Sequence, residues 1–188
     1  MPPLPHRNSR SLGKALCRWR RLNWIKQIDL AERLGISQPA LSRFEAGATE
    51  LDPRAQSLVI DLLSARPASV ADRALCRLVA GSQNPVHLIC DLSHRLLAAS
   101  PARLAQWRSS LAELEGRSLW PFASPSIINA EADLPSLGWF EESTSQIEFQ
   151  TDAFSCPELS IPQGKVRWTR ITLATGGHAR LVEQMAPH

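Results

Sequence analysis

Apolar side chains recur at helical spacing through residues 11–80. The first set occupies positions i, i+3, i+4 and i+7 and consists of Leu12, Ala15, Leu16 and Trp19. Such a set lies on one face of a helix, so we expect a helix from Ser11 onward. The same spacing predicts further helices at about 26–34, 38–46, 53–65 and 70–80.

Beyond residue 85 the pattern changes to short apolar runs that are typical of β-strands. The expected strands are at 86–90, 95–99, 147–150, 166–174 and 179–185. Gly176-Gly177 lies between the last two runs and is a hairpin signal. Residues 101–114 are expected to be helical.

Together these patterns predict an all-α helical bundle followed by a smaller α+β domain. The start of the chain is rich in proline, which disfavours a helix there. The predicted units are a flexible arm at 1–9, a helical domain at 10–66, a connector helix and linker at 67–85, and an α+β domain at 86–188.

Charge is distributed unevenly between the two predicted domains. The chain has a net charge of +3, but residues 1–66 hold 11 Lys/Arg against 6 Asp/Glu, and the remainder is net acidic. A basic excess in the helical domain is the sign expected for contact with nucleic-acid phosphates. The chain contains neither a run of about eighteen apolar residues nor an apolar signal-peptide core, so we expect a cytoplasmic protein with no membrane partner.

No catalytic or metal site is predicted. The four cysteines, Cys17, Cys76, Cys90 and Cys156, are far apart in sequence, whereas zinc ligands usually come in closely spaced pairs. We expect reduced thiols that mostly pack in cores. The sequence also lacks a nucleophile elbow such as G-x-S-x-G, so the chain is expected not to be an enzyme.

The segment 26–47 carries the strongest functional signal. It predicts two short helices joined by a tight turn, in which Gly35 permits the turn and Ile36 fills the space between the helices. Ser37 is a good N-cap for the second helix. The outer face of this second helix is polar and presents Gln38, Ser42 and Arg43. Gln and Arg side chains can form paired hydrogen bonds with base edges in the major groove of DNA.

Residues 11–65 resemble the lambda-repressor/Cro-like (XRE) family of helix-turn-helix regulators. The matching positions are Gln27, Leu30-Ala31, Gly35, Ser37, Leu41-Ser42-Arg43, Glu45 and Gly47. The resemblance implies a five-helix bundle in which the residue like Gln27 contacts phosphate and helps to position the reading helix. The candidate DNA-binding residues are Lys26, Gln27, Ser37, Gln38, Pro39, Ser42 and Arg43.

The resemblance also implies an ion pair between Arg20 and Glu45, with the main role of holding the bundle together. Two residues depart from the family pattern. Lys26 replaces the usual Ser or Thr cap of the first motif helix, which removes about 1 kcal/mol of capping but supplies a candidate phosphate contact. Pro39 stands in the first turn of the reading helix, where relatives often carry a polar residue, so we hypothesise fewer direct polar base contacts.

Residues 86–186 resemble a PAS domain, with the matching segments 88–101, 114–119 and 164–168 followed by the final hairpin. Ser100 replaces the more usual Asn, and 121–146 matches poorly. The resemblance implies a five-stranded antiparallel sheet with helices on one face, dimerisation, and a ligand in some members. The Asn-Cys-Arg signature of flavin photosensors is absent and 121–146 contains no His for haem, so no cofactor is predicted and a small-molecule ligand stays open.

The histidines and aromatic residues of this second domain allow two interpretations. His87, His94 and His178 are expected to be surface or strand residues rather than ligands. The aromatic residues either line a pocket or form an ordinary core, and the core is preferred. They are Trp120, Phe122, Trp139, Phe140 and Phe149.

The sequence therefore predicts a sequence-specific transcription regulator that binds double-stranded DNA. A homodimer would read a pseudo-palindromic operator with half-sites about one helical turn apart. Two alternatives stay open: the second domain dimerises without a ligand, or the helical domain docks a protein partner and the chain is an adaptor.

Overall fold

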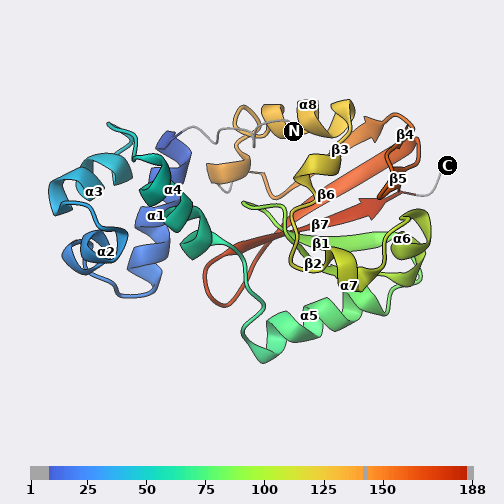
Figure 1. The fold of residues 1–188 in the computed structure, drawn as a ribbon, viewed down its shortest axis with the longest axis horizontal. Helices are drawn as coiled ribbons and strands as arrows, with labels where there is room; N and C mark the ends of the chain where they lie inside the picture. The colour runs from blue at the N-terminus through green and yellow to red at the C-terminus, as the bar shows by residue number, and fades with distance from the viewer. Residues whose placement is uncertain (1–8, 142–143, 186–188) are drawn as a thin grey trace.

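The computed structural model describes residues 9–141 and 144–185, so the predicted arm lies almost wholly outside the described residues. The N-terminal half is helical, and its elements are α1 (Ser9–Leu22), α2 (Gln27–Leu34), α3 (Gln38–Glu45), α4 (Pro53–Leu63) and α5 (Val70–Ala80). All five helices expected from the apolar spacing are present, with ends shifted by at most two residues. Figure 1 shows α1–α4 gathered as a bundle beside the sheet.

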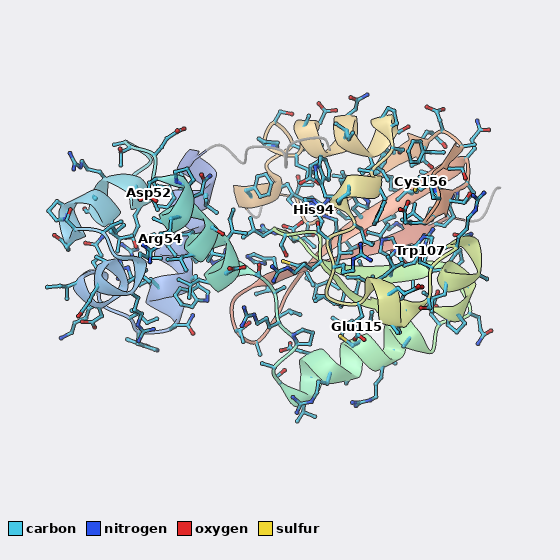
Figure 2. The ribbon with its side chains drawn as sticks, viewed as in Figure 1. Asp52, Arg54, His94, Trp107, Glu115 and Cys156 are labelled. Carbon is cyan, nitrogen blue, oxygen red and sulfur yellow. The ribbon has the colours of Figure 1, made fainter. Side chains whose placement is uncertain are left out.

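Side-chain caps fix where several of these helices begin. Asp52 accepts hydrogen bonds from the backbone of Arg54 and Ala55 at the start of α4, the region that Figure 2 labels with Asp52 and Arg54. At α5, Ser69 and Asp72 form a reciprocal capping box. The bundle core beneath these helices contains Leu12, Leu16, Leu30, Ala31, Leu34, Leu41, Phe44, Val59 and Leu63.

One close backbone approach holds α1 against α3. A Cβ atom added at Gly13 would lie 2.0 Å from the carbonyl oxygen of Phe44. Only glycine fits at that distance, because any side chain would overlap the backbone of α3. Gly13 therefore sets the separation of the first and third helices.

The second domain is built on a five-stranded antiparallel sheet, as predicted, with the order β2-β1-β7-β6-β3. Its strands are β1 (Val86–Cys90), β2 (Leu96–Ala99), β3 (Gln146–Thr151), β6 (Gly164–Thr172) and β7 (His178–Gln184), with a separate hairpin of β4 (Phe154–Ser155) and β5 (Ser160–Ile161). Between β2 and β3 lie α6 (Pro101–Gln106), α7 (Leu111–Leu114), η1 (Trp120–Phe122), α8 (Pro125–Asp133) and η2 (Trp139–Glu141). This domain is the larger of the two, not the smaller as expected.

The helical stretch expected over 101–114 is present as two short helices, α6 and α7. It is interrupted at Trp107, whose backbone is extended (φ −94, ψ 151) and which pairs with Leu159 in an isolated β-bridge. Burial of the Trp107 ring, which is only 8% exposed, outweighs local helix propensity at this position. The result is a bend that carries α6 and α7 over the sheet.

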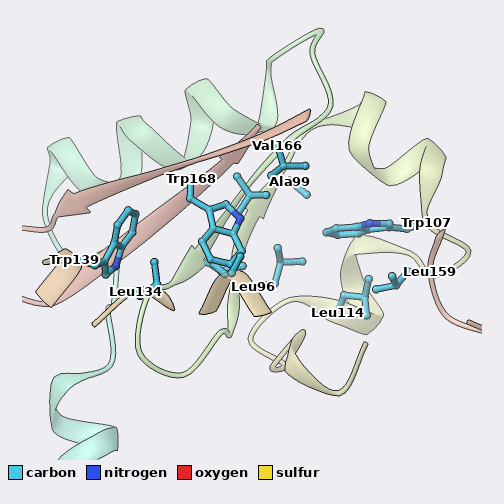
Figure 3. Close-up of a cluster of buried hydrophobic side chains, with 12 residues drawn as sticks. Leu96, Ala99, Trp107, Leu114, Leu134, Trp139, Leu159, Val166 and Trp168 are labelled. Carbon is cyan, nitrogen blue, oxygen red and sulfur yellow. The ribbon is translucent and has the colours of Figure 1, made fainter. Parts of the chain in front are cut away.

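Alternation along the strands divides the domain core into two layers. On one face, Leu88 and Cys90 of β1 pack with α5. On the other face, Ile89, Val166 and Trp168 pack against the segment that contains α6–α8. Figure 3 shows Trp107, Trp139 and Trp168 in this larger layer. The aromatic residues preferred as core belong to it: Trp120 and Trp139 are buried, and Phe122, Phe140 and Phe149 pack at its margin.

The bundle meets the sheet at the end of α4. Ser64 forms a parallel β-bridge with His178, and the backbone N–H of Ala65 donates to Cys90 Sγ at 3.2 Å. In α5, Asp72 Oδ1 accepts a hydrogen bond from Ala174 N at 3.2 Å. These contacts join the bundle to β1 and to the β6–β7 hairpin.

Candidate nucleic-acid interface

The turn between α2 and α3 has the geometry that the sequence predicts. Gly35 caps α2 in the left-handed conformation (φ 68, ψ 28), and its N–H bonds back to the last turn of the helix. Ser37 Oγ then accepts from Ala40 N at 3.3 Å and caps α3. Pro39 lies in the first turn of α3, where no intrahelical N–H is needed, and Lys26 makes no side-chain cap at α2.

Burial divides α3 into an inner and an outer face. Leu41 and Phe44 are almost fully buried in the bundle. On the outer side Gln38, Pro39 and Arg43 are exposed and Ser42 is half-buried. Lys26 and Ser37 are exposed and Gln27 is half-buried at the adjoining ends of α2 and the turn. All seven candidate DNA-binding residues are therefore at least partly open to solvent in one short segment.

A continuous hydrogen-bond chain connects this outer face to the bundle. Arg20 Nε donates to Glu45 Oε1 at 2.8 Å and Arg20 Nη2 donates to Glu45 Oε2 at 3.0 Å, so the expected ion pair is present. Gln27 Nε2 donates to Glu45 Oε2 at 2.8 Å. Gln38 Nε2 then donates to Gln27 Oε1, also at 2.8 Å. The first residue of α3 is thus held through two side chains to α1.

The charges of Arg20 and Glu45 in this hydrogen-bond chain stabilise each other. Burial by itself raises the pKa of Glu45, but hydrogen bonds from Arg20 and Gln27 outweigh it and hold the pKa below its ordinary value of 4.5. The hydrogen bond from Arg20 to Glu45 raises the pKa of the guanidinium. Glu45 is therefore ionised at neutral pH and neutralised by Arg20, so it does not present an open negative charge to an approaching phosphate.

A basic cleft beside α3 was not predicted. It has a volume of about 480 Å³ and is lined by Lys14, Cys17, Arg18, Arg21, Trp24 and Glu45. The cleft shares Glu45 with the hydrogen-bond chain, so it adjoins the candidate interface. The signal in the sequence was the i, i+4, i+7 spacing of the three basic residues, which places them on one face of α1.

The described residues contain no candidate membrane span and no candidate metal cluster. None of their helices has the length and apolar character needed to cross a bilayer. Within the described part of the chain, no three His, Cys, Asp or Glu side chains lie close enough together to hold a metal ion.

Comparison with known proteins identifies the helical segment. Residues 18–56 match the family model HTH_3, described as helix-turn-helix. No curated protein matches the chain. Among solved structures, the PAS domain of BvgS from Bordetella pertussis is 10% identical, with 64% of this chain and 90% of that chain covered and a TM-score of 0.42. An RNA-binding light-oxygen-voltage receptor is 11% identical, with 95% of this chain and 59% of that chain covered and a TM-score of 0.43.

Proposed function

We propose that this chain, with a helix-turn-helix domain at residues 18–56, is a regulator of transcription that binds double-stranded DNA sequence-specifically. The observation that carries the proposal is the outer face of α3, which is polar and open while the inner face is fixed in the bundle core. An α-helix with its side chains is about 10–12 Å across, which matches the width of the major groove.

Within this proposal the candidate residues have distinct roles. Gln38, Ser42 and Arg43 face base edges, and the ring of Pro39 contacts a thymine methyl group. Lys26, Gln27 and Ser37 lie toward the phosphates that flank the groove. The hydrogen bond from Gln38 to Gln27 uses one of the two N–H groups of the Gln38 amide, so one N–H and the carbonyl oxygen are available to a base.

We propose further that the chain acts as a homodimer on a pseudo-palindromic operator, with the α+β domain as the dimerisation and sensing unit. Two-fold symmetry would place two copies of α3 in successive major grooves about 34 Å apart. The sensing role is supported by a cavity of about 90 Å³ between the sheet and the helices of the α+β domain. Native mass spectrometry of the purified protein reports both the dimer and any small molecule that copurifies.

Selection of duplexes from a random library, followed by fluorescence anisotropy, tests DNA binding. Arg43→Ala should weaken binding to the selected site by about 5- to 150-fold, the loss of 1–3 kcal/mol expected for one base-reading arginine. Arg77→Ala is the matched control, because it removes the same charge from α5, away from α3 (Figure 1). Equal affinity of the Arg43 and Arg77 variants would remove Arg43 from the reading set.

A second candidate function, docking of a protein partner, is favoured by two exposed apolar side chains. Trp24 is 94% exposed and Ile28 is 63% exposed, near the start of α2. Salt dependence separates the two functions, because DNA binding releases counterions and an apolar contact does not. If the chain binds DNA, Lys26→Ala should reduce the slope of log K against log salt by about 0.9 per protomer. If it binds no duplex even at low salt, the adaptor function takes the place of DNA binding.

A further inference from the structure

The cavity of the α+β domain has an apolar body and a polar end. Its volume is about 90 Å³, and Trp107, Trp120 and Trp168 contribute to its apolar wall. The polar end is lined by His87 of β1, Arg103 of α6 and Gln184 of β7. Figure 2 labels Trp107 and His94, two of the residues that line the cavity.

Two buried arginines line this cavity, and only one is neutralised. Arg180 is 1% exposed and forms ion pairs with Asp91 and Glu131. Arg103 is 4% exposed, and the described residues include no carboxylate in ion-pair contact with it. Burial lowers the pKa of Arg103 to about 10, so the side chain still carries a full positive charge at neutral pH. A buried charge of this kind is costly without an anion.

The Arg103 guanidinium is fixed but not saturated. Nη1 donates to Gln106 Oε1 at 2.8 Å, and Nη2 donates to the carbonyl oxygen of Pro85 at 2.7 Å. Nε is buried and has no hydrogen-bond partner among the described residues. The side chain is therefore held in place by neutral acceptors, and its Nε–H remains for a ligand.

Two further unsatisfied atoms lie near the same point. Gln184 N donates to the Pro85 carbonyl that Arg103 also contacts, which brings these two residues together. Gln184 Oε1 and His87 Nδ1 are buried without a hydrogen-bond partner in the described part of the chain. Burial, and then the charge of Arg103, hold the pKa of His87 well below its ordinary value, so its imidazole is neutral and has one donor and one acceptor nitrogen.

We propose that this cavity binds a 2-hydroxymonocarboxylate of two carbon atoms, held by Arg103, His87 and Gln184. The carboxylate accepts from Arg103 Nε and the imidazole, and the adjacent hydroxyl donates to Gln184 Oε1. The size follows from the cavity volume: a cavity of about 150 Å³ accepts benzene, so 90 Å³ limits the ligand to fewer heavy atoms than benzene has. This inference rests on the sensing half of the proposed function.

Isothermal titration calorimetry of the full chain in a carboxylate-free buffer tests the ligand class with three probes. Glycolate should bind. Glycolamide, which has the same shape without the charge, should bind at least about 10-fold more weakly because it loses a charge-assisted hydrogen bond. Acetate, which lacks the hydroxyl, should bind about 2- to 10-fold more weakly. Equal affinity for glycolate and glycolamide, or no heat with glycolate at millimolar concentration, would overturn the proposal.

Three variants test the assigned residues. Arg103→Gln should remove the preference for glycolate over glycolamide, whereas Arg108→Gln, an exposed arginine one residue past the bend at Trp107, should keep it. Ala123→Leu leaves Arg103 intact and fills the cavity that Ala123 lines, so it should abolish glycolate binding. If Arg103→Gln does not fold, the Ala123 variant decides: undiminished binding there contradicts the site.

Operator affinity measured with and without glycolate separates this inference from the proposed function. Glycolate binding that leaves operator affinity unchanged supports the ligand site and overturns the sensing role. Operator binding by a chain that takes up no glycolate overturns the ligand inference alone. Quenching or enhancement of tryptophan fluorescence on glycolate addition provides an independent readout, because three tryptophans line the cavity.

Discussion

The Arg20–Glu45 pair gives the sharpest test of how the helix-turn-helix domain is held together. The side chains of Arg20 and Glu45 are only 12% and 4% exposed, and two hydrogen bonds of 2.8 and 3.0 Å join them. Glu45→Gln would leave the guanidinium with an amide acceptor and the Ile25 carbonyl in place of a carboxylate. We expect a loss of about 2–4 kcal/mol, between the values for exposed and fully buried pairs.

A double-mutant cycle with Arg20→Met and Glu45→Gln isolates the interaction itself. We expect a coupling free energy of about 2 kcal/mol from urea unfolding followed by far-UV circular dichroism. The matched control is the Arg167–Glu148 pair on β6 and β3, which has similar contacts but side chains 31% and 28% exposed. That pair should give a much smaller coupling, because water screens exposed charges. Equal coupling in the two cycles would refute the argument from burial.

Acid should weaken the interaction between Arg20 and Glu45. The pKa of Glu45 is held below 4.5 in the folded state, so ionised Glu45 contributes stability that is fully present above its unfolded-state pKa. That contribution is lost as the pH falls through the folded-state pKa. The cycle repeated at about pH 3 should therefore give a smaller coupling than at pH 7.

Three further substitutions follow from single contacts. Gly13→Ala places a Cβ 2.0 Å from the Phe44 carbonyl oxygen and should lower the free energy of unfolding in urea by more than about 3 kcal/mol. In the control Gly81→Ala, the nearest contact of the new Cβ is at 3.3 Å, so the change should stay within about 1 kcal/mol. Similar losses in the two variants would contradict the close approach. Arg180→Met removes the cation that Asp91 and Glu131 share, so that Arg170 remains beside Asp91 and His94 beside Glu131. It should lower the thermal midpoint by at least about 6 °C, and an unchanged midpoint would show that these remaining partners compensate. Pro39→Gln adds an amide on the exposed first turn of α3 and should change the bases preferred in a duplex selection, so an unchanged consensus would mean that Pro39 faces no base.

The helix-turn-helix could be predicted because its determinants are local. Gly35 adopts the left-handed conformation that its position in the pattern implied, and Ser37 makes the expected cap. The apolar spacing of Leu30, Ala31 and Leu34 identified the buried face directly. Each of these signals acts over a few residues, so no long-range information was needed.

The features of the fold that could not be predicted depend on contacts between residues that are distant in sequence. The helical stretch expected over 101–114 breaks at Trp107 because the ring is buried against partners distant in sequence, including Leu159. The role of Gly13 depends on Phe44, more than thirty residues away, and a lone glycine in a helical pattern does not reveal it. The cavity residues His87, Arg103 and Gln184 come together only through strand register and the Pro85 carbonyl. His87 was expected as a surface or strand residue, and it lies on a strand with its Nδ1 buried.

The junction between the domains determines how a ligand in the sheet could affect α3. Arg180 lines the cavity on β7, and two residues before it on the same strand His178 pairs with Ser64 at the end of α4. The α4 residue Leu63 is in turn part of the bundle core that holds Leu41 of α3. A direct series of contacts therefore joins the cavity to the candidate interface.

Sensing requires these contacts to exist in two arrangements. Hydrogen exchange at the Ala65 and Ala174 amides, which bond to Cys90 and Asp72 across the junction, should then change when the cavity is filled. Identical exchange with and without ligand would mean that the junction is a rigid connection and would contradict this route of sensing.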